Sequence, residues 1–321
     1  MKKLKIALLS GGISTEREVS LAGGDQVFEA LDKSKYQITR YDPKFDLSRL
    51  VDDANEIDIA LIILHGPNGE DGRIQGFLDL LCVPYQGTGV LGSALAMNKT
   101  VAKQIYEQVG LPVPQYRVMK KGDKILPKEI LQAIGLPIVV KPVQGGSSIG
   151  MSIVKSEKEL SPAIETAFAC DDEILFEQYI RGIEITGSVL GNTDLTALPI
   201  VEIIPDEIHD FFNYTAKYTP GATTEICPAR MDERLTEKAK NFAKIAHRAL
   251  CCCDYSRTDM ILCEEDIFVL ETNTIPGMTS TSLLPLAAKT AGIPFAQLLD
   301  RLIELSLERS GNAMQHIETR S

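Results

Sequence analysis

The segment from Arg257 to Ser282 constrains this fold most, because its polar residues converge in only one pairing of two strands. It reads RTDMILCEEDIFVLETNTIPGMTSTS, which predicts two short strands, an acidic turn, and a turn that enters a helix. Alternation places Arg257 and Asp259 on one face of the first strand, and Glu271 and Asn273 on one face of the second. With the loop EED, Asp259 lies opposite Glu271 and Arg257 opposite Asn273. A slip of one residue would separate them.

Two carboxylates and an amide at one spot favour a metal site. These groups would repel each other unless a cation lay between them, and all-oxygen ligands suit Mg²⁺, which keeps waters and bridges phosphates. An ordinary hairpin whose acids face water explains the same spacing, because Asp and Glu are mostly exposed. Spacing alone leaves both interpretations open.

Length and charge limit the function classes. A chain of 321 residues is long enough for two or three domains. A formal net charge of −11 argues against a nucleic-acid partner, although a local basic pocket is compatible with it. No apolar run approaches the ~18 residues of a membrane span, and the run in MKKLKIALLSGG is too short for a signal peptide. It predicts a first buried strand instead.

The seven cysteines show neither CxxC nor a zinc-type spacing with histidine. Cys251, Cys252 and Cys253 form the only cluster, and adjacent cysteines do not easily bridge each other. We therefore expect reduced, buried thiols in a cytoplasmic protein.

The N-terminal segment alternates strands and helices. Strands at 4–9, 36–41 and 58–64 with a helix at 18–31 predict a doubly wound α/β domain. Ligands of such sheets gather at the carboxyl ends of the strands. Two loops follow those ends and carry Glu16 and His65. Glu16 suits a substrate ammonium, whereas His65 taken alone favours a structural histidine.

The run from Gly87 to Gly92 is a literal GxGxxG but a weak sign of a dinucleotide site. Such a site needs a strong strand before the glycines and an acid about 20 residues later. Here the sequence favours a small-residue turn that enters a helix. A nicotinamide-dependent oxidoreductase built on this turn is the rival interpretation.

The middle of the chain suggests a phosphate-binding loop. The strand LPIVVKP presents Lys141 and is followed by the small-residue loop at 144–150. Backbone N–H groups exposed by glycine can wrap a phosphate, although an exposed hairpin turn fits as well. Glu177 and Glu184 follow on two strands and are suited to ribose hydroxyls, or are simply exposed acids.

Two later segments can complete a site. The loop at 205–229 is too long for a simple connector and carries several aromatic residues, so it predicts a lid. Gly277 can offer a backbone N–H to developing negative charge. The following helix begins near Ser280 or Ser282 and directs its N-terminus to the same place.

In this order the segments resemble the D-alanine–D-alanine ligases of the ATP-grasp superfamily. The resemblance rests on LLSGGISTEREVS, LHGPNGEDGRIQG, Asn98-Lys99, VKPVQGGSSIGM, YTAKY, SRTD and LETNTIPGMTSTSLLP. It implies an α/β (α+β) chain with a three-domain ATP-grasp fold. The implied units are an N-terminal doubly wound parallel-sheet domain at 1–97, a central subdomain at 98–182, a C-terminal catalytic subdomain at 183–310 and a polar tail at 311–321.

The resemblance also implies residue roles. The implied nucleotide contacts are Lys99, Lys141, Gly146, Ser148, Glu177, Gln178, Ile180, Glu184 and Lys217. The implied ligands of two Mg²⁺, with Mn²⁺ as an alternative, are Asp259, Glu271 and Asn273. The implied catalytic residues are Glu16, Ser147, Tyr218, Arg257, Gly277 and Ser282, and the implied substrate contacts are His65, Ser282 and Leu283.

The implied reaction uses ATP to join two D-alanine molecules through an acyl phosphate, for peptidoglycan precursors. The resemblance further implies a cytoplasmic homodimer without nucleic-acid or membrane partners. Three rivals stay open. The first is a sister ligase of the D-alanine–D-lactate type or another ATP-grasp carboxylate–amine ligase, the second is the oxidoreductase above, and the third is a non-catalytic nucleotide-binding module. Tyr218 favours an amine nucleophile, and the intact set around Arg257 argues against a mere binder.

Overall fold

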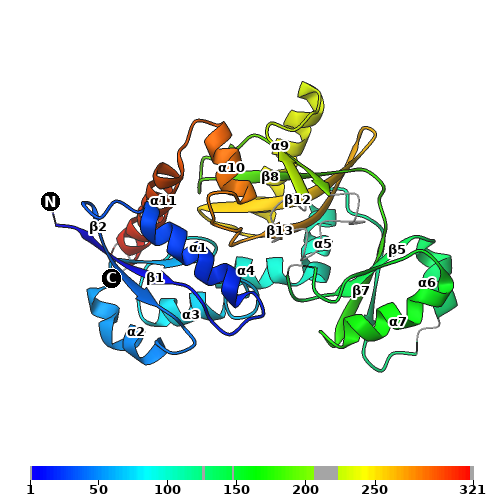
Figure 1. Cartoon of the computed structure of the whole chain (residues 1–321), viewed down its shortest axis with the longest axis horizontal. Helices are drawn as coiled ribbons and strands as arrows, with labels where there is room; N and C mark the ends of the chain where they lie inside the picture. Colours follow the sequence, from blue (N-terminus) through cyan, green and yellow to red (C-terminus); the bar gives the residue numbers. More distant parts are fainter. Residues whose placement is uncertain (1, 125–126, 147, 206–222, 319–321) are drawn as a thin grey trace.

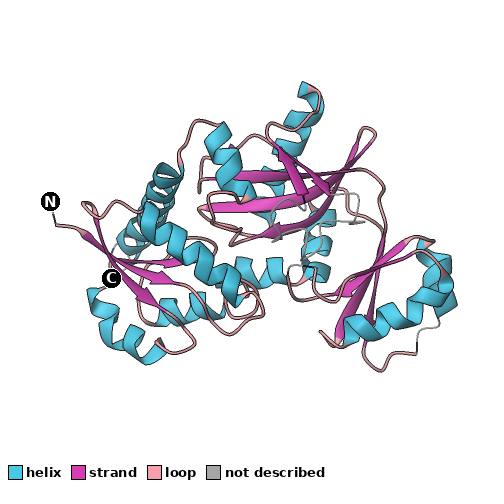
Figure 2. Cartoon of the chain, viewed as in Figure 1, coloured by secondary structure: helices cyan, strands magenta, loops and turns pink. Residues whose placement is uncertain are grey.

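Three β-sheets organise the chain. The computed structural model describes residues 2–124, 127–146, 148–205 and 223–318. Figure 1 shows the N-terminal sheet at one end of the molecule, the sheet of the middle segment at the other end, and the C-terminal sheet between and above them. Helices cover all three sheets (Figure 2). None of the helices in the described ranges is long and apolar enough to cross a bilayer.

The N-terminal sheet is parallel, in the order β2-β1-β3. Its elements are β1 (Leu4–Leu9), α1 (Arg17–Ala30), β2 (Tyr36–Tyr41), α2 (Leu47–Asp53), a 3₁₀ turn (Ala54–Glu56), β3 (Ile59–Ile62) and α3 (Arg73–Leu80). All four residues of β3 are buried, as a strand covered on both faces requires. The predicted α/β class and doubly wound N-terminal sheet are confirmed.

The middle segment forms an antiparallel sheet in the order β4-β7-β5-β6. Its elements are β4 (Tyr116–Lys120), α6 (Pro127–Ile134), β5 (Ile138–Pro142), β6 (Ser152–Val154), α7 (Glu157–Phe168) and β7 (Glu173–Gln178). Helices α6 and α7 lie side by side on one face of this sheet (Figure 1). Buried residues such as Ile138, Leu160 and Phe176 form its core.

The C-terminal sheet is antiparallel, in the order β11-β10-β8-β12-β13, with β9 paired to β8. Its strands are β8 (Ile183–Leu190), β9 (Thr196–Ala197), β10 (Val201–Pro205), β11 (Thr223–Ile226), β12 (Tyr255–Cys263) and β13 (Asp266–Asn273). It carries α9 (Glu233–Ala249) and also α5 (Lys99–Gln108). On α5, the hydroxyl of Tyr106 lies 2.7 Å from Thr272 Oγ1 of β13. Helix α5 therefore packs on the C-terminal sheet, although it precedes the middle sheet in sequence.

The hairpin β12–β13 has the predicted pairing but not the predicted turn. Arg257 pairs with Asn273 and Asp259 with Glu271, as expected. Cys263, however, pairs with Asp266, so the loop has two residues and the three-residue loop EED is wrong. A register shift between Asp259 and Met260 restores the pairing, because a β-bulge inserts one extra residue into β13.

The last helices join the N-terminal sheet to the C-terminal sheet. Helix α10 (Leu283–Thr290) and helix α11 (Phe295–Glu318) pack with the N-terminal strands in one core, which includes Leu8, Leu284 and Leu302. Helix α11 continues through most of the predicted polar tail, and no proline interrupts it. The boundaries at 97/98, 182/183 and 310/311 stay predictions.

The GxGxxG run serves packing. Gly87 has a φ of +93° and its N–H donates to Asp254 Oδ2 at 2.7 Å. Gly92 lies inside α4 (Val90–Met97), where an added Cβ would come within 2.6 Å of the Leu250 carbonyl oxygen. The predicted turn into a helix fits this geometry. In the cysteine cluster only Cys252 is buried, so the expectation of buried thiols is wrong for Cys251 and Cys253, which lie on the turn after α9.

Candidate active site

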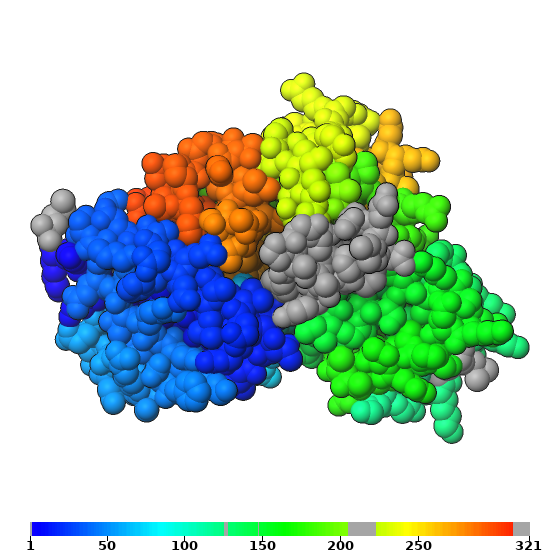
Figure 3. All heavy atoms as spheres, in the orientation of Figure 1, coloured from blue at the N-terminus to red at the C-terminus, as the bar shows by residue number. Residues whose placement is uncertain are grey.

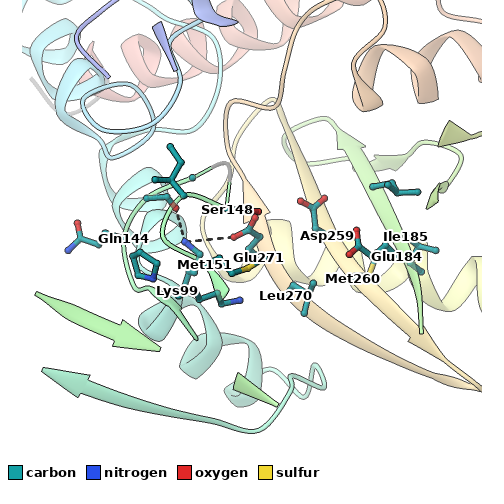
Figure 4. Close-up of a pocket in the computed structure, with 16 residues that line it drawn as sticks. Lys99, Gln144, Ser148, Met151, Glu184, Ile185, Asp259, Met260, Leu270 and Glu271 are labelled. Carbon is teal, nitrogen blue, oxygen red and sulfur yellow. Dashed lines mark hydrogen bonds and ion pairs between the residues drawn. The ribbon is translucent and has the colours of Figure 1, made fainter. Parts of the chain in front are cut away.

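A cleft opens between the middle sheet and the C-terminal sheet (Figure 4). It is lined by Lys99, Lys141, Pro142, Gln144, Gly145, Gly146, Ser148, Ile149, Met151, Glu184, Ile185, Ile203, Asp259, Met260, Leu270 and Glu271. Five predicted nucleotide contacts are among them: Lys99, Lys141, Gly146, Ser148 and Glu184. The surface view shows the N-terminal segment in blue at one end of this face and the middle segment in green at the other (Figure 3).

Lysines and the small-residue loop form one wall of the cleft. Lys99 begins α5, and its Nζ donates to the Gly145 carbonyl oxygen at 2.7 Å and lies 3.9 Å from Glu271 Oε2 (Figure 4). Asn98 caps this helix by accepting from the Val101 N–H at 3.0 Å, which fixes where Lys99 projects. Lysine charges beside a glycine-rich loop can bind the phosphates of a nucleotide.

Apolar side chains form the floor of the cleft. Met151 comes from the loop side, whereas Ile185, Ile203, Met260 and Leu270 come from the C-terminal sheet. Flat apolar walls suit an aromatic base. Sequence reasoning missed these residues, because their alternation in the strands is equally typical of an ordinary core.

The acids of the opposite wall converge as the register predicted. Arg257 donates from Nε and Nη2 to the two oxygens of Asp259, at 2.9 and 2.8 Å. Asn273 Nδ2 donates to Asp259 Oδ2 at 3.0 Å, and Thr186 donates to Asp259 Oδ1 at 2.6 Å. Asp259 is therefore held rigidly, with Asn273 beside it and Glu271 across the pair.

This donor set fits Mg²⁺. Asp259 and Glu271 supply carboxylate oxygens and Asn273 an amide oxygen, which are the hard ligands that Mg²⁺ takes together with waters and phosphate oxygens. Within the described ranges, no cluster of three or more His, Cys, Asp or Glu side chains has metal-binding geometry.

The two N-terminal loops meet the glycine-rich loop. The side chain of Glu16 is buried, and a Cβ built on Gly146 would lie 3.1 Å from its Oε2. His65 is also buried. Burial lowers the pKa of His65 and the charge of Arg257 lowers it further, whereas Glu16 opposes the change. Glu16, His65 and Arg257, which lie far apart in the sequence, therefore share one electrostatic environment.

The turn after β13 closes this region. Ser282 is the N-cap of α10, and a Cβ on Gly277 would lie 2.9 Å from its Oγ. Ser282 Oγ also lies 2.7 Å from Thr279 Oγ1. Leu283 follows as the first residue of α10, so the helix N-terminus and Gly277 lie together as the sequence suggested.

Glu177, Gln178 and Ile180 do not line the cleft in the described part of the chain. Glu177 lies behind Lys141, whose Nζ donates to its Oε2 at 2.6 Å, and it also pairs with Lys103 of α5. Gln178 is exposed and Ile180 is buried. Ser147, Lys217 and Tyr218 fall outside the described residues, as does most of the predicted lid.

Sequence reasoning missed Lys103 and Glu70. The side chain of Lys103 is fully buried. From the sequence alone, a lysine in a helix is expected to lie on the solvent-exposed face. Glu70 lines a recess shared with Lys99, Gly146 and Glu271. Burial raises the pKa of Glu70 to about 8, with a further contribution from Glu16. Neither residue has a spacing that marks it in the sequence.

Two antiparallel sheets that close on a cleft, with lysines on one wall and paired acids on the other, place the chain in the ATP-grasp class of ligases. Residues 105–304 match the family model described as D-ala D-ala ligase C-terminus, and residues 42–88 match D-ala D-ala ligase N-terminus. The chain belongs to the D-alanine–D-alanine ligase family.

Relatives match nearly the whole chain. The D-alanine–D-alanine ligase of Syntrophobacter fumaroxidans is 59% identical over 307 residues, covering 96% of this chain and 99% of the relative. That of Desulfotalea psychrophila is 53% identical over 311 residues, covering 96% and 97%. Among solved structures, the D-alanine–D-alanine ligase from Bacillus anthracis complexed with ATP has a TM-score of 0.85 and 36% identity, covering 97% and 99%. The VanG D-Ala:D-Ser ligase from Enterococcus faecalis has a TM-score of 0.82 and 33% identity, covering 95% and 100%.

Proposed function

We propose that this enzyme joins two D-alanine molecules to D-alanyl-D-alanine with consumption of ATP, in the supply of peptidoglycan precursors. The carboxylate of the first D-alanine attacks the γ-phosphorus, which forms an acyl phosphate and releases ADP. The amine of the second D-alanine then attacks the acyl carbon, and inorganic phosphate leaves. The observation that carries the proposal is the pairing of Asp259 with Glu271 at a cleft that also contains Lys99 and Lys141.

Each side of the site has a proposed task. Lys99 and Lys141 bind the phosphates, and the loop at Gly146 and Ser148 covers them. Glu184 accepts from the ribose hydroxyls. We assign Gln178 and Ile180 to the base from the resemblance alone, since neither lines the cleft in the described part of the chain. Asp259, Glu271 and Asn273 would hold two Mg²⁺, which neutralise charge on the transferring phosphoryl group. Mn²⁺ would be held by the same oxygen ligands.

The substrates occupy the other side of the glycine-rich loop. Buried Glu16 pairs with the ammonium of the first D-alanine, with His65 beside it. Arg257 and the Gly277 N–H stabilise the oxyanion, because fixed donors are most effective where charge develops. Ser282 and the N-terminus of α10 at Leu283 bind the carboxylate of the second D-alanine. We assign Ser147, Lys217 and Tyr218 to the hydrogen-bonded closure of the site from the resemblance alone.

The test is phosphate release from ATP and Mg²⁺ with D-alanine, L-alanine or neither present. We expect release only with D-alanine, together with the dipeptide by mass spectrometry, and a loss of release with EDTA that Mg²⁺ or Mn²⁺ reverses. Binding of ATP without D-alanine-dependent release would contradict the proposed reaction and assign the chain to another carboxylate–amine ligase.

A second substrate other than D-alanine is the alternative, favoured by the similarity to a D-Ala:D-Ser ligase. In a mixture of D-alanine with D-serine or D-lactate, the rate of the mixed product can be compared with the rate of D-alanyl-D-alanine. Equal rates of the two products would establish this alternative. We further propose a cytoplasmic homodimer, as the resemblance implies. Light scattering after size-exclusion chromatography tests the dimer, and a monomeric mass over the working concentration range would exclude it.

A further inference from the structure

Three charged side chains meet behind the lysine wall of the cleft. Lys103 of α5 and Lys141 of β5 both form ion pairs with the single carboxylate of Glu177 on β7, one with each oxygen. The side chains of Lys103, Glu177 and Lys141 are 0, 4 and 10% exposed. Two lysine side chains therefore share one carboxylate in a nearly dry environment.

The two lysines differ in what else they reach. Lys141 lines the cleft, whereas Lys103 is absent from the described residues that do. Lys103 contacts Glu177 instead. Its position follows from the helix: Lys99 and Lys103 are four residues apart on α5, so they project from one face. Lys99 reaches the cleft, and Lys103 reaches Glu177, which lies behind the cleft wall.

The shared carboxylate is fully ionised. Burial alone would raise the pKa of Glu177, but the charges of Lys103 and Lys141 outweigh burial and bring it to about 2. A buried carboxylate without a partner is very unfavourable, so Glu177 must keep at least one lysine close. If Lys141 were its only partner, any movement of Lys141 toward a phosphate would leave Glu177 uncompensated.

We propose that Lys103 is a positioning residue for nucleotide binding: it compensates Glu177, so that Lys141 can turn toward the phosphates of ATP. This inference rests on the proposed function. It assigns to Lys103 a task that depends on its charge and on Glu177, and not on filling space. Removing Glu177 should therefore remove the need for Lys103.

The experiment measures the dissociation constant of ATP without D-alanine for wild type, Lys103→Met, Glu177→Gln and the double variant. We expect Lys103→Met to raise the dissociation constant about tenfold, within the usual range of coupling between sites. In the Glu177→Gln background the same change should cost less than about twofold, as a double-mutant cycle resolves. The KM for D-alanine should change little in Lys103→Met.

Two further variants separate charge from packing. Lys103→Arg keeps the cation and should bind ATP nearly as wild type does. Lys120→Met is the matched control, because Lys120 pairs with Glu173 at 2.6 Å on the same sheet but at an exposed place. It should leave ATP affinity unchanged. Unfolding midpoints accompany every variant.

Three outcomes would overturn the proposal. One is an equal loss of ATP affinity from Lys103→Met with and without Glu177, and another is a parallel rise in the KM for D-alanine. The third applies even if Lys103→Met alone does not fold: ATP binding by the double variant that is far weaker than ATP binding by Glu177→Gln would contradict the role. Wild-type protein that binds ATP but releases no phosphate with D-alanine would refute the reaction and leave this test intact.

Discussion

Glu70 has an environment that strongly alters its acid–base behaviour. It lies in the loop after β3, where the Gly66 N–H donates to its Oε2 at 2.7 Å. Burial, with the charge of Glu16 as a smaller cause, raises its pKa from 4.5 to about 8. Between these values the folded protein keeps a proton that the unfolded chain releases. The contribution of Glu70 to stability therefore falls as pH rises through this window.

We predict that Glu70→Gln removes this dependence, because the amide does not ionise and its oxygen can still accept from Gly66. Its free energy of unfolding, relative to wild type, should rise from pH 5 to pH 8 by up to about 1 kcal/mol per pH unit. Urea unfolding without nucleotide or Mg²⁺ measures it. A constant difference between the two proteins across this range would show that Glu70 ionises normally.

At the scale of elements, the hairpin β12–β13 shows that the strand pairing can be predicted correctly even when the turn is predicted wrongly. The polar residues on one face specify which pairs must meet, so Asp259 opposite Glu271 was predictable. Nothing in CEEDIF distinguishes a three-residue loop from a two-residue turn with a bulge. Glu264 adopts a φ of +55° in that turn, and glutamate gives little indication of a left-handed conformation.

The GxGxxG run leads to an element-scale prediction. In α4, an added Cβ on Gly92 would lie within 2.7 Å of both the Leu250 and Cys251 carbonyl oxygens, which are backbone atoms that cannot easily move. Gly92→Ala should therefore lower the free energy of unfolding by about 1–3 kcal/mol. Gly76→Ala in α3 is the control: its nearest neighbour would be Val90 Cγ2 at 3.5 Å. There the better helix propensity should add up to about 1 kcal/mol.

Chemical denaturation of both alanine variants tests this pair. Similar stabilities for the two would mean that α4 shifts away from the Leu250 turn without cost. Binding of a nicotinamide dinucleotide that Gly92→Ala abolishes would instead restore the oxidoreductase interpretation of this run.

At the scale of the whole molecule, periodicity and motif spacing predicted the sheets, but not what lies between them. Glu16 and Gly146 come together because a loop of the N-terminal domain meets the glycine-rich loop of the middle sheet. Lys103 and Glu177 meet because α5 packs across two sheets. Such contacts depend on how separate elements dock, and no local pattern in the sequence encodes docking.

One buried residue ties the N-terminal and C-terminal parts. Asp254 Oδ2 accepts from the Gly87 N–H and the Ser306 hydroxyl, both at 2.7 Å, and lies 3.5 Å from Arg309 Nη2. We predict that Asp254→Ala lowers the free energy of unfolding by about 3 kcal/mol, because it leaves the buried Gly87 N–H without its acceptor and removes the anionic partner of Arg309.

Urea unfolding followed by fluorescence and circular dichroism measures this loss, and ATP affinity serves as the control because Asp254 does not line the described part of the cleft. A loss of less than about 1 kcal/mol would mean that the junction is held mainly by the apolar core around Leu8 and Leu302.

The cluster of Lys103, Glu177 and Lys141 also restricts how this family can diverge. A neutral substitution at 177 leaves the buried Lys103 without its partner, and one at 103 leaves Glu177 dependent on Lys141 alone, so each step is disfavoured until the other has occurred. Positions 103 and 177 should therefore vary together among descendants of this chain, or not at all. Two residues 74 positions apart would then be conserved or replaced together, because Lys141 must be able to move toward the nucleotide.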